Sequence, residues 1–198
     1  MIKIASVDKI NRLINETIRE EKCDHLDIYS CYKKKERFLT IINFFVAACI
    51  YMYGFYLHNE ISINVTFELL VFFVGLALLW FLVGLPIHET IHVIMTPKKL
   101  KYTYVVFSPP ITLSTVSLCW MSKKRTLLFL IMPFLIIQSL LTLLIFISSD
   151  SPMHYLVFLY FSYMNLFSAE GDLFSAIYIL RKLHYDCELL GMYVRRQQ

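Results

Sequence analysis

The sequence predicts an all-α polytopic membrane protein with four transmembrane helices and a short β-hairpin-like element in the central cytosolic loop. Three observations favour this fold class. Hydrophobic residues make up 58% of the 198 positions, whereas soluble domains are usually closer to half apolar. The apolar residues gather in runs long enough to cross a hydrocarbon core, which takes about 20 helical residues. Lysines and arginines stand at the ends of these runs.

Four apolar segments are expected to span the membrane, and basic residues give their orientation. The loops at 58–66 and 149–152 contain no Lys or Arg, whereas basic residues flank the opposite ends of the spans. By the positive-inside rule, both termini and the loop at 96–125 are cytosolic. We therefore expect a multi-pass protein of the cell membrane, in bacteria the cytoplasmic membrane. The predicted spans are 38–57, 69–95, 126–148 and 153–180.

The charge of the chain indicates contact with lipid. The formal net charge is +4, but the basic residues cluster at the ends of apolar runs, where they set topology and meet anionic lipid. The lipid bilayer is therefore an expected partner, and no nucleic acid is expected. For example, Lys123, Lys124 and Arg125 precede the third span.

The chain is predicted to have three parts. Residues 1–37 form a cytosolic amphipathic segment, residues 38–182 a membrane-embedded domain, and residues 183–198 a cytosolic tail. In the first part, apolar residues recur at roughly helical spacing, which indicates a helix that packs on the protein or lies on the membrane. These apolar residues are Ile2, Ile4, Val7, Ile10, Leu13 and Ile14.

The central loop contains two stretches that resemble strands. Residues 101–107 and 111–119 are rich in β-branched and aromatic residues, and Pro109-Pro110 lies between them. This pattern predicts a short two-stranded unit with a proline turn. We hypothesise that a substrate pairs with the edge of this unit as an extended strand, and that the 102–107 strand is needed for it. A purely structural role is the alternative.

The motif His88-Glu89-Thr90-Ile91-His92 lies near the end of the second span. Residues four apart lie on one face of a helix, so both imidazoles can reach one ion. Glu89 can then act as the general base toward water at that ion. Ionisable side chains are costly inside a membrane, which favours a functional site over helix-end residues that reach the interface. The pattern predicts a Zn²⁺ site with Glu89 as the catalytic residue.

Two prolines flank this motif. Pro86 removes one helical hydrogen bond and is expected to kink or loosen the turn that holds His88. Pro97 is expected to end the helix. A loosened backbone at membrane depth suits a cavity that admits water, although a packing kink without a role is an equal alternative for Pro86.

A catalytic zinc needs a third protein ligand and one position open to water. Two acids, Glu170 and Asp172, lie inside the fourth apolar segment. Asp172 is the preferred third ligand and Glu170 its main competitor. The fourth span is expected to place Asp172 in the cytosolic half of the membrane, at a depth compatible with the two histidines. Gly171 would permit an unwound backbone beside the acid.

The motif and the later Asn165…Gly171-Asp172 segment resemble the site-2 protease group of intramembrane zinc metalloproteases. The similarity is greatest to small bacterial zincin peptidases allied to that group. The resemblance implies that His88, His92 and Asp172 bind zinc and that Glu89 is the catalytic base. It also implies that Asn165 helps to position the substrate.

These features predict a membrane-embedded zinc metalloendopeptidase. Its expected substrates are membrane-anchored peptides or proteins, cleaved near the cytosolic face. The alternative is a non-enzymatic membrane protein that binds or transports a metal through the same residues. Transporters commonly contain repeated halves, and no internal repeat is visible here. A third reading keeps the zinc but assigns a hydrolase that acts on lipid-linked substrates.

Overall fold

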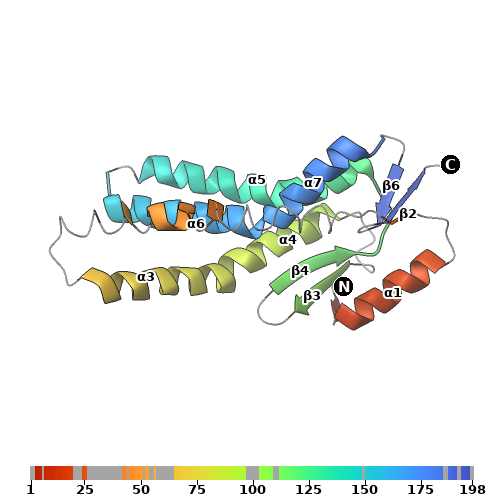
Figure 1. Cartoon of the computed structure of the whole chain (residues 1–198), viewed down its shortest axis with the longest axis horizontal. Helices are drawn as coiled ribbons and strands as arrows, with labels where there is room; N and C mark the ends of the chain where they lie inside the picture. Colours follow the sequence, from red (N-terminus) through yellow and green to blue (C-terminus); the bar gives the residue numbers. More distant parts are fainter. Residues whose placement is uncertain are drawn as a thin grey trace. The chain divides into compact units, whose positions relative to one another are not determined.

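The computed structural model describes most helices of the chain and two small sheets (Figure 1). The described residues are 3–5, 7–19, 24–25, 42–43, 45–50, 52–53, 56, 65–96, 103–108, 112–148, 150–184, 187–190 and 193–196. The fold is mostly helical with small β elements, as the sequence predicts.

The chain divides into two compact units. The first unit comprises Met1–Cys31, Pro86–Pro133 and Gly171–Gln198, and the second comprises Tyr32–Leu85 and Phe134–Glu170. Each unit is therefore assembled from segments that are far apart in the sequence.

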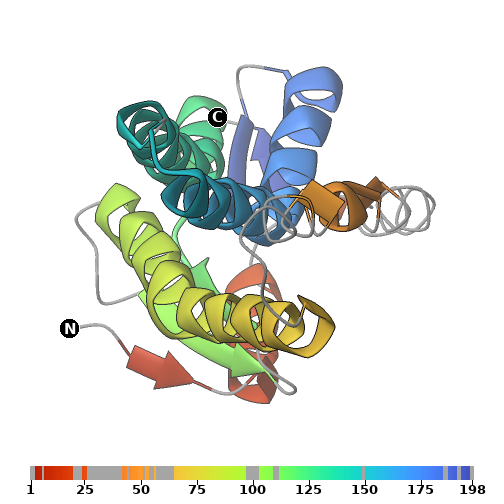
Figure 2. The same cartoon turned by 90° about the vertical axis from the view of Figure 1, so that its left-hand side faces the viewer.

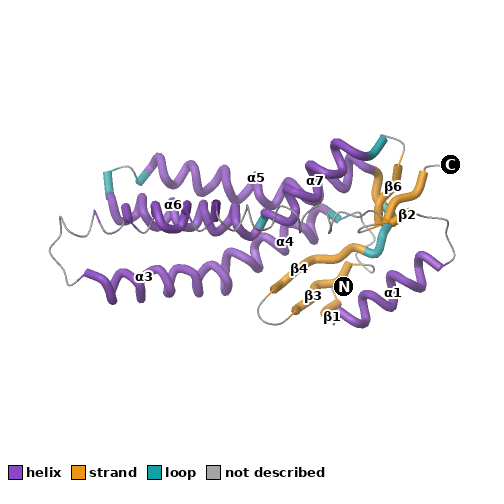
Figure 3. Tube along the Cα trace, viewed as in Figure 1, coloured by secondary structure: helices purple, strands orange, loops and turns teal. Residues whose placement is uncertain are grey.

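A three-stranded sheet in the first unit confirms the predicted hairpin and extends it. Strands β3 (Thr103–Ser108) and β4 (Thr112–Ser117) pair antiparallel. Strand β1 (Lys3–Ala5) adds to β3 in parallel, so the strand order is β1-β3-β4 (Figure 3). The 102–107 segment, which the pairing hypothesis needs, therefore belongs to the central strand β3 and is not an edge among the described strands. Among the described strands, β4 is the edge strand on the hairpin side of β3.

Helix α1 (Val7–Arg19) packs on this sheet. Ile10 is buried with Tyr104 and Val106 of β3, and Leu13 and Ile14 pack beside them. The amphipathic segment is therefore a packed helix, which is one of the two predicted readings. It begins at Val7 and not at Ile2, because residues 3–5 leave the helical pattern to pair with β3.

A second sheet contains segments near both ends of the chain, with strand order β2-β7-β6-β5. Its core consists of Ile179, Cys187 and Leu189 with neighbouring apolar residues of α5 and α7. The sequence predicts only a tail after residue 182, so the strands in this segment are a difference from the prediction. Their bounds are β2 Asp24–His25, β5 Met121–Ser122, β6 Cys187–Leu190 and β7 Tyr193–Arg196.

Lys123 does not lie on the surface with the other basic residues of its cluster. It is 4% exposed, and its Nζ donates to the backbone oxygens of Leu180 and Leu183. Leu180 lies in the last turn of α7 (Glu170–Lys182), where helical carbonyls lack intrahelical donors, and Leu183 directly follows the helix. The expectation that Lys123 meets anionic lipid is therefore wrong, whereas Lys124 and Arg125 are exposed.

The second predicted span is one helical stretch with a wider turn inside it. Helix α3 (Val65–Leu79) continues through the π-helical turn η1 (Trp80–Gly84) into α4 (Leu85–Met95). The wider turn ends at Gly84, two positions before Pro86, which cannot donate a backbone hydrogen bond. The predicted loosening before the motif thus takes the form of a π turn.

Trp80 and Gly84 fit closely in this turn. A Cβ atom on Gly84 would lie 2.5 Å from Cε3 of the Trp80 indole. The indole Nε1 donates to Ser168 Oγ at 2.9 Å, and Ser168 Oγ donates to the Met164 oxygen at 2.8 Å. The turn therefore needs a residue without a side chain at position 84.

The third predicted span is the long helix α5 (Lys123–Ile147), but the fourth is not one helix. Helix α6 (Pro152–Ser168) ends at Ala169, and α7 begins at Glu170. The interruption falls at Ala169, whereas Gly171 lies inside α7. Figure 2 shows the helices from a second side.

Two described helical stretches are long and apolar enough to cross a membrane, Leu70–Met95 and Lys123–Ile147. They correspond to the second and third predicted spans. The first predicted span, 38–57, is described only in part, and the residues described within it are helical. The fourth predicted span, 153–180, is divided between α6 and α7.

Candidate metal centre

Helix α4 places His88 and His92 one turn apart on the same face, as their spacing predicts. Their ring centroids are 4.9 Å apart. Both side chains are buried, with 1% and 3% of their surface exposed. Two buried imidazoles on one face require polar partners, because an unpaired buried polar group is costly.

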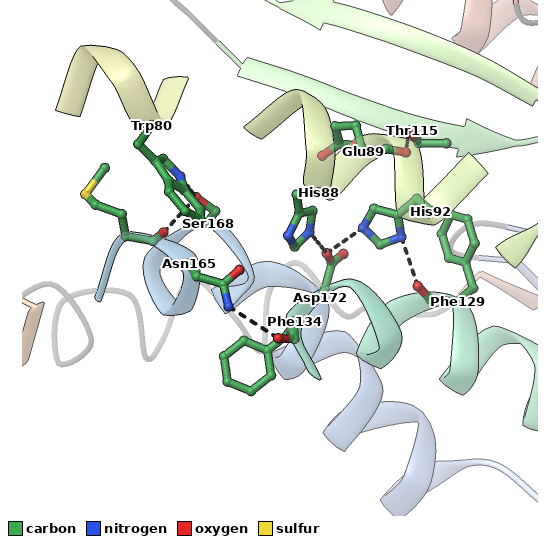
Figure 4. Close-up of polar contacts among 11 residues, drawn as sticks. Trp80, His88, Glu89, His92, Thr115, Phe129, Phe134, Asn165, Ser168 and Asp172 are labelled. Atoms are coloured by element: carbon green, nitrogen blue, oxygen red, sulfur yellow. Dashed lines mark hydrogen bonds and ion pairs between the residues drawn. The ribbon is translucent and has the colours of Figure 1, made fainter. Parts of the chain in front are cut away.

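Asp172 of α7 supplies such a partner (Figure 4). Its Oδ2 atom lies 3.3 Å from Nε2 of His88 and 3.0 Å from Nε2 of His92. Among the described His, Cys, Asp and Glu residues, these three form a group that is close enough together to hold one metal ion. Their donor atoms all lie within 4.8 Å of one another.

The two separations that involve Asp172 fit zinc. A tetrahedral zinc with bonds of 2.0–2.1 Å holds neighbouring ligand atoms about 3.3 Å apart. The distances of 3.0 and 3.3 Å from the carboxylate oxygen to the imidazole nitrogens are close to this value. Imidazole and carboxylate are also suitable zinc ligands. His88, His92 and Asp172 therefore form a suitable three-ligand zinc site.

Glu170, the competing acid, has another partner. Its Oε2 atom accepts a hydrogen bond of 2.8 Å from Nδ2 of Asn43. Both residues belong to the second unit, whereas the two histidines and Asp172 belong to the first. The structure therefore favours Asp172 over Glu170 as the third ligand.

A backbone carbonyl orients the His92 ring. Nδ1 of His92 lies 2.9 Å from the Phe129 oxygen on α5. A carbonyl can only accept, so Nδ1 carries the proton of this hydrogen bond and Nε2 faces Asp172. The Phe129 ring also packs against the imidazole, with centroids 4.6 Å apart. Such an outer partner fixes the tautomer of a metal-binding histidine.

His88 is held differently. Its Nδ1 atom is buried and has no hydrogen-bond partner among the described residues. Its hydrogen-bond contact with Asp172 is made on the Nε2 side. Among the described residues, His92 has an outer hydrogen bond that sets the direction of its ring, and Nδ1 of His88 has none.

Glu89 lies beside the ligand group without belonging to it. The residue is 7% exposed, and its Oε2 atom has no hydrogen-bond partner in the described part of the chain. Its backbone oxygen accepts a hydrogen bond of 3.3 Å from Thr115 of β4. A buried carboxylate oxygen without a partner needs an explanation, and a proton-accepting role provides one.

Asn165 belongs to the second unit and is fully buried. Its Nδ2 donates to the Phe134 oxygen at 3.3 Å and to Oε1 of Gln138 at 3.2 Å. Because both partners can only accept at these atoms, the side-chain atom that faces them is the amide nitrogen. The other atom of the amide is the oxygen Oδ1. Oδ1 has no hydrogen-bond partner among the described residues.

The sequence pattern did not predict the groups that support the centre. The structure brings His88, His92 and Asp172 together, with Glu89 next to them in the motif. The supporting groups are the Phe129 carbonyl and the Thr115 hydroxyl. A backbone carbonyl leaves no signal in the side-chain pattern, and Thr115 is one of several similar residues in its strand.

Comparison with known proteins agrees with this geometry. The model of a family described as "Putative zincin peptidase" matches residues 81–186, which is more than half of the chain and includes all four residues of the centre. No curated protein and no solved structure shows significant similarity to the chain. Zincins are zinc peptidases, so the family implies zinc at the His88, His92 and Asp172 group. The chain belongs to this putative zincin peptidase family.

Proposed function

We propose that this protein is a membrane-embedded zinc metalloprotease that hydrolyses peptide bonds of membrane-anchored peptides or proteins near the cytosolic face. The proposal depends on one observation above all. His88, His92 and Asp172 converge beside Glu89, whose buried Oε2 atom has no partner among the described residues. Three ligands and an adjacent carboxylate with one unpartnered oxygen are the parts that a hydrolytic zinc site needs.

The protein residues have distinct roles in this proposal. His88, His92 and Asp172 hold the metal. When bound there, zinc supplies a Lewis acid that polarises a peptide carbonyl and lowers the pKa of water to about 7. Glu89 accepts a proton from the water whose oxygen attacks the carbonyl carbon. It then gives that proton to the amide nitrogen that leaves when the C–N bond breaks.

The apolar surface of two helices supports the membrane setting. In the candidate spans Leu70–Met95 and Lys123–Ile147, 6% and 17% of the most apolar window is buried inside the protein. The core helix of a soluble protein would be mostly buried. Large apolar side chains such as Leu82 and Phe146 are 75% and 73% exposed. Lipid is a suitable environment for such faces.

Strand β4 is a suitable place for the substrate to bind. It is an edge of its sheet among the described strands, and Thr115 connects it to the backbone of Glu89. An extended peptide can add to a free sheet edge through main-chain hydrogen bonds. We infer that a membrane segment unwinds and pairs with β4, which exposes its peptide bonds to the centre.

Oδ1 of Asn165, which has no partner among the described residues, is an acceptor for a donor of the substrate. Because its Nδ2 is engaged by Phe134 and Gln138, the Oδ1 atom has a fixed direction. A peptide N–H is a suitable donor for this oxygen. This assignment follows the resemblance to site-2 proteases and is part of the proposal.

The variant Glu89→Gln tests the proposed function. Cells expressing the wild type or Glu89→Gln are compared by mass spectrometry of new protein N-termini in their membranes. We expect products in the wild type at the cytosolic ends of anchored segments. In the variant we expect about 10²- to 10⁴-fold slower cleavage, the usual loss for a missing general base. Zinc content should be equal in both proteins.

The same variant separates the proposal from its non-enzymatic rival. A metal carrier does not need a proton acceptor beside the ligands, so Glu89→Gln would retain zinc uptake into liposomes. Uptake by both proteins without any difference in N-termini would favour the carrier. Cleavage that needs Glu89 in the absence of uptake would favour the protease.

Proline substitutions along β4 test the strand pairing. Backbone N–H groups of an edge strand face the neighbouring strand and the free edge at alternate residues. Among Leu113, Ser114, Thr115 and Val116, Pro at the outward-facing positions should keep zinc binding and lose cleavage. Pro at the alternate positions should disturb the hairpin as well. Unchanged cleavage in all four variants would contradict pairing at β4.

A further inference from the structure

Helix α5 contains a proline at a position that affects the metal centre. Pro133 lies in the interior of this 25-residue helix. A helical residue normally donates its N–H to the carbonyl four residues earlier, and proline has no N–H. The carbonyl that loses its helical donor is therefore that of Phe129.

This carbonyl is the one that binds His92. The Phe129 oxygen lies 2.9 Å from Nδ1 of His92. The proline ring also clashes with the carbonyl four residues before it, which tilts that carbonyl out of the helix. Both effects favour an acceptor that points away from α5.

We propose that Pro133 is a positioning residue of the metal centre. By withholding a backbone N–H from the Phe129 carbonyl, it reserves this acceptor for His92 and so fixes the ring with Nε2 toward Asp172. The inference rests on the proposed zinc site. Pro133 would act through the Phe129 carbonyl and His92, without contact to the metal or the substrate.

The other prolines in described helices do not have this effect on the centre. Pro152 stands at the start of α6, where its N–H would have no helical acceptor. Pro86 follows the π turn η1, and its own oxygen accepts a hydrogen bond of 2.7 Å from Thr90. Only Pro133 removes the donor from a carbonyl that the structure shows bound to a histidine of the centre. Pro133 is itself fully buried.

The substitution Pro133→Ala restores the competing N–H. We expect zinc to bind about 10- to 100-fold more weakly, the usual effect of losing an outer partner of a metal ligand. The measurement is the zinc dissociation constant of the full chain in detergent, obtained by competition with a chelator. Because alanine favours a helix interior more than proline does, the metal-free variant should unfold no more easily than the wild type.

A backbone ester separates the missing N–H from the shape of the ring. Lactic acid at position 133, introduced by nonsense suppression, has the side chain of alanine and no N–H. It should restore zinc affinity to within a few-fold of the wild type. The control Pro152→Ala should bind zinc as the wild type does.

Three results would overturn the inference. Pro133→Ala could bind zinc as tightly as the wild type, which would leave the zinc site intact and remove the role of Pro133. The alanine and lactic acid variants could be equally weakened, which would make the proline ring and not the missing N–H responsible. A wild type that binds no zinc would overturn the proposed function together with this inference.

Discussion

Oδ2 of Asp172 lies 3.0 Å from Nε2 of His92, although the two residues are 80 positions apart in the sequence. The same oxygen lies 3.3 Å from Nε2 of His88. One carboxylate oxygen thus faces two imidazole nitrogens. Two such nitrogens beside one oxygen need either shared protons or a cation, and the family match favours a zinc ion.

Asp172→Asn should remove zinc. The amide has almost the shape of the carboxylate but lacks its charge and is a poor zinc ligand. We expect about one zinc per chain in the wild type and almost none in Asp172→Asn. The measurement is elemental mass spectrometry of the detergent-purified protein after supplementation with zinc.

Glu170→Gln is the matched control for that experiment. It makes the same chemical change two positions earlier, on a residue that binds Asn43 in the second unit. The variant should retain its zinc. Zinc lost from Glu170→Gln but kept by Asp172→Asn would make Glu170 the third ligand.

Zinc should stabilise the folded protein. A ligand that binds only the folded state adds about 2.7 kcal/mol when its concentration is 100 times the dissociation constant. Denaturant unfolding in detergent should therefore show higher stability with zinc than with a chelator. His92→Ala should show no such difference, because it lacks a ligand. An equal response of His92→Ala would place the stabilising zinc elsewhere.

The local features of this protein could be predicted from its sequence. The i, i+4 spacing of His88 and His92 places both rings on one face of any helix, whatever surrounds it. The hairpin of β3 and β4 follows from neighbouring β-branched runs with a turn signal between them. Asp172 could be predicted as a ligand because an acid inside an apolar segment needs a partner.

The features that were missed depend on contacts between distant segments. Strand β1 has three residues and pairs with β3 about 100 positions later. The strands of the second sheet are also short, with two to four residues each. A strand of this length has no periodic pattern of its own, so it is stable only when tertiary contacts supply its partner. The Phe129 carbonyl is invisible in the side-chain pattern for a similar reason.

Gly84→Ala should destabilise the second unit. The new Cβ atom would lie 2.5 Å from the Trp80 ring, and the hydrogen bond to Ser168 restrains that ring. Overpacking of this kind usually costs about 1–3 kcal/mol. Gly75→Ala is the control, because a Cβ there meets no atom within 4 Å. It should be neutral or stabilising by about 0.5–1 kcal/mol.

Denaturant unfolding monitored by tryptophan fluorescence compares the two glycine variants. The expected order of stability is Gly75→Ala, then the wild type, then Gly84→Ala. Equal stability of the two variants would show that the Trp80 ring can move away without cost.

Helix α5 should cross the membrane from one side to the other. Its 25 residues extend about 37 Å at 1.5 Å per residue, which exceeds a hydrocarbon core of about 30 Å. The exposed residues Lys124 and Asp150 lie near its two ends. We expect Lys124 on the cytosolic side, because the positive-inside rule retains basic residues there.

Single cysteines at these two positions, in a background without the five native cysteines, test the orientation. In intact cells, a membrane-impermeant maleimide should label Asp150→Cys. It should label Lys124→Cys only after the membrane is permeabilised. Labelling of both positions from the same side would show that α5 does not cross the bilayer. Since His92 binds the α5 residue Phe129, that result would also contradict a centre held at membrane depth.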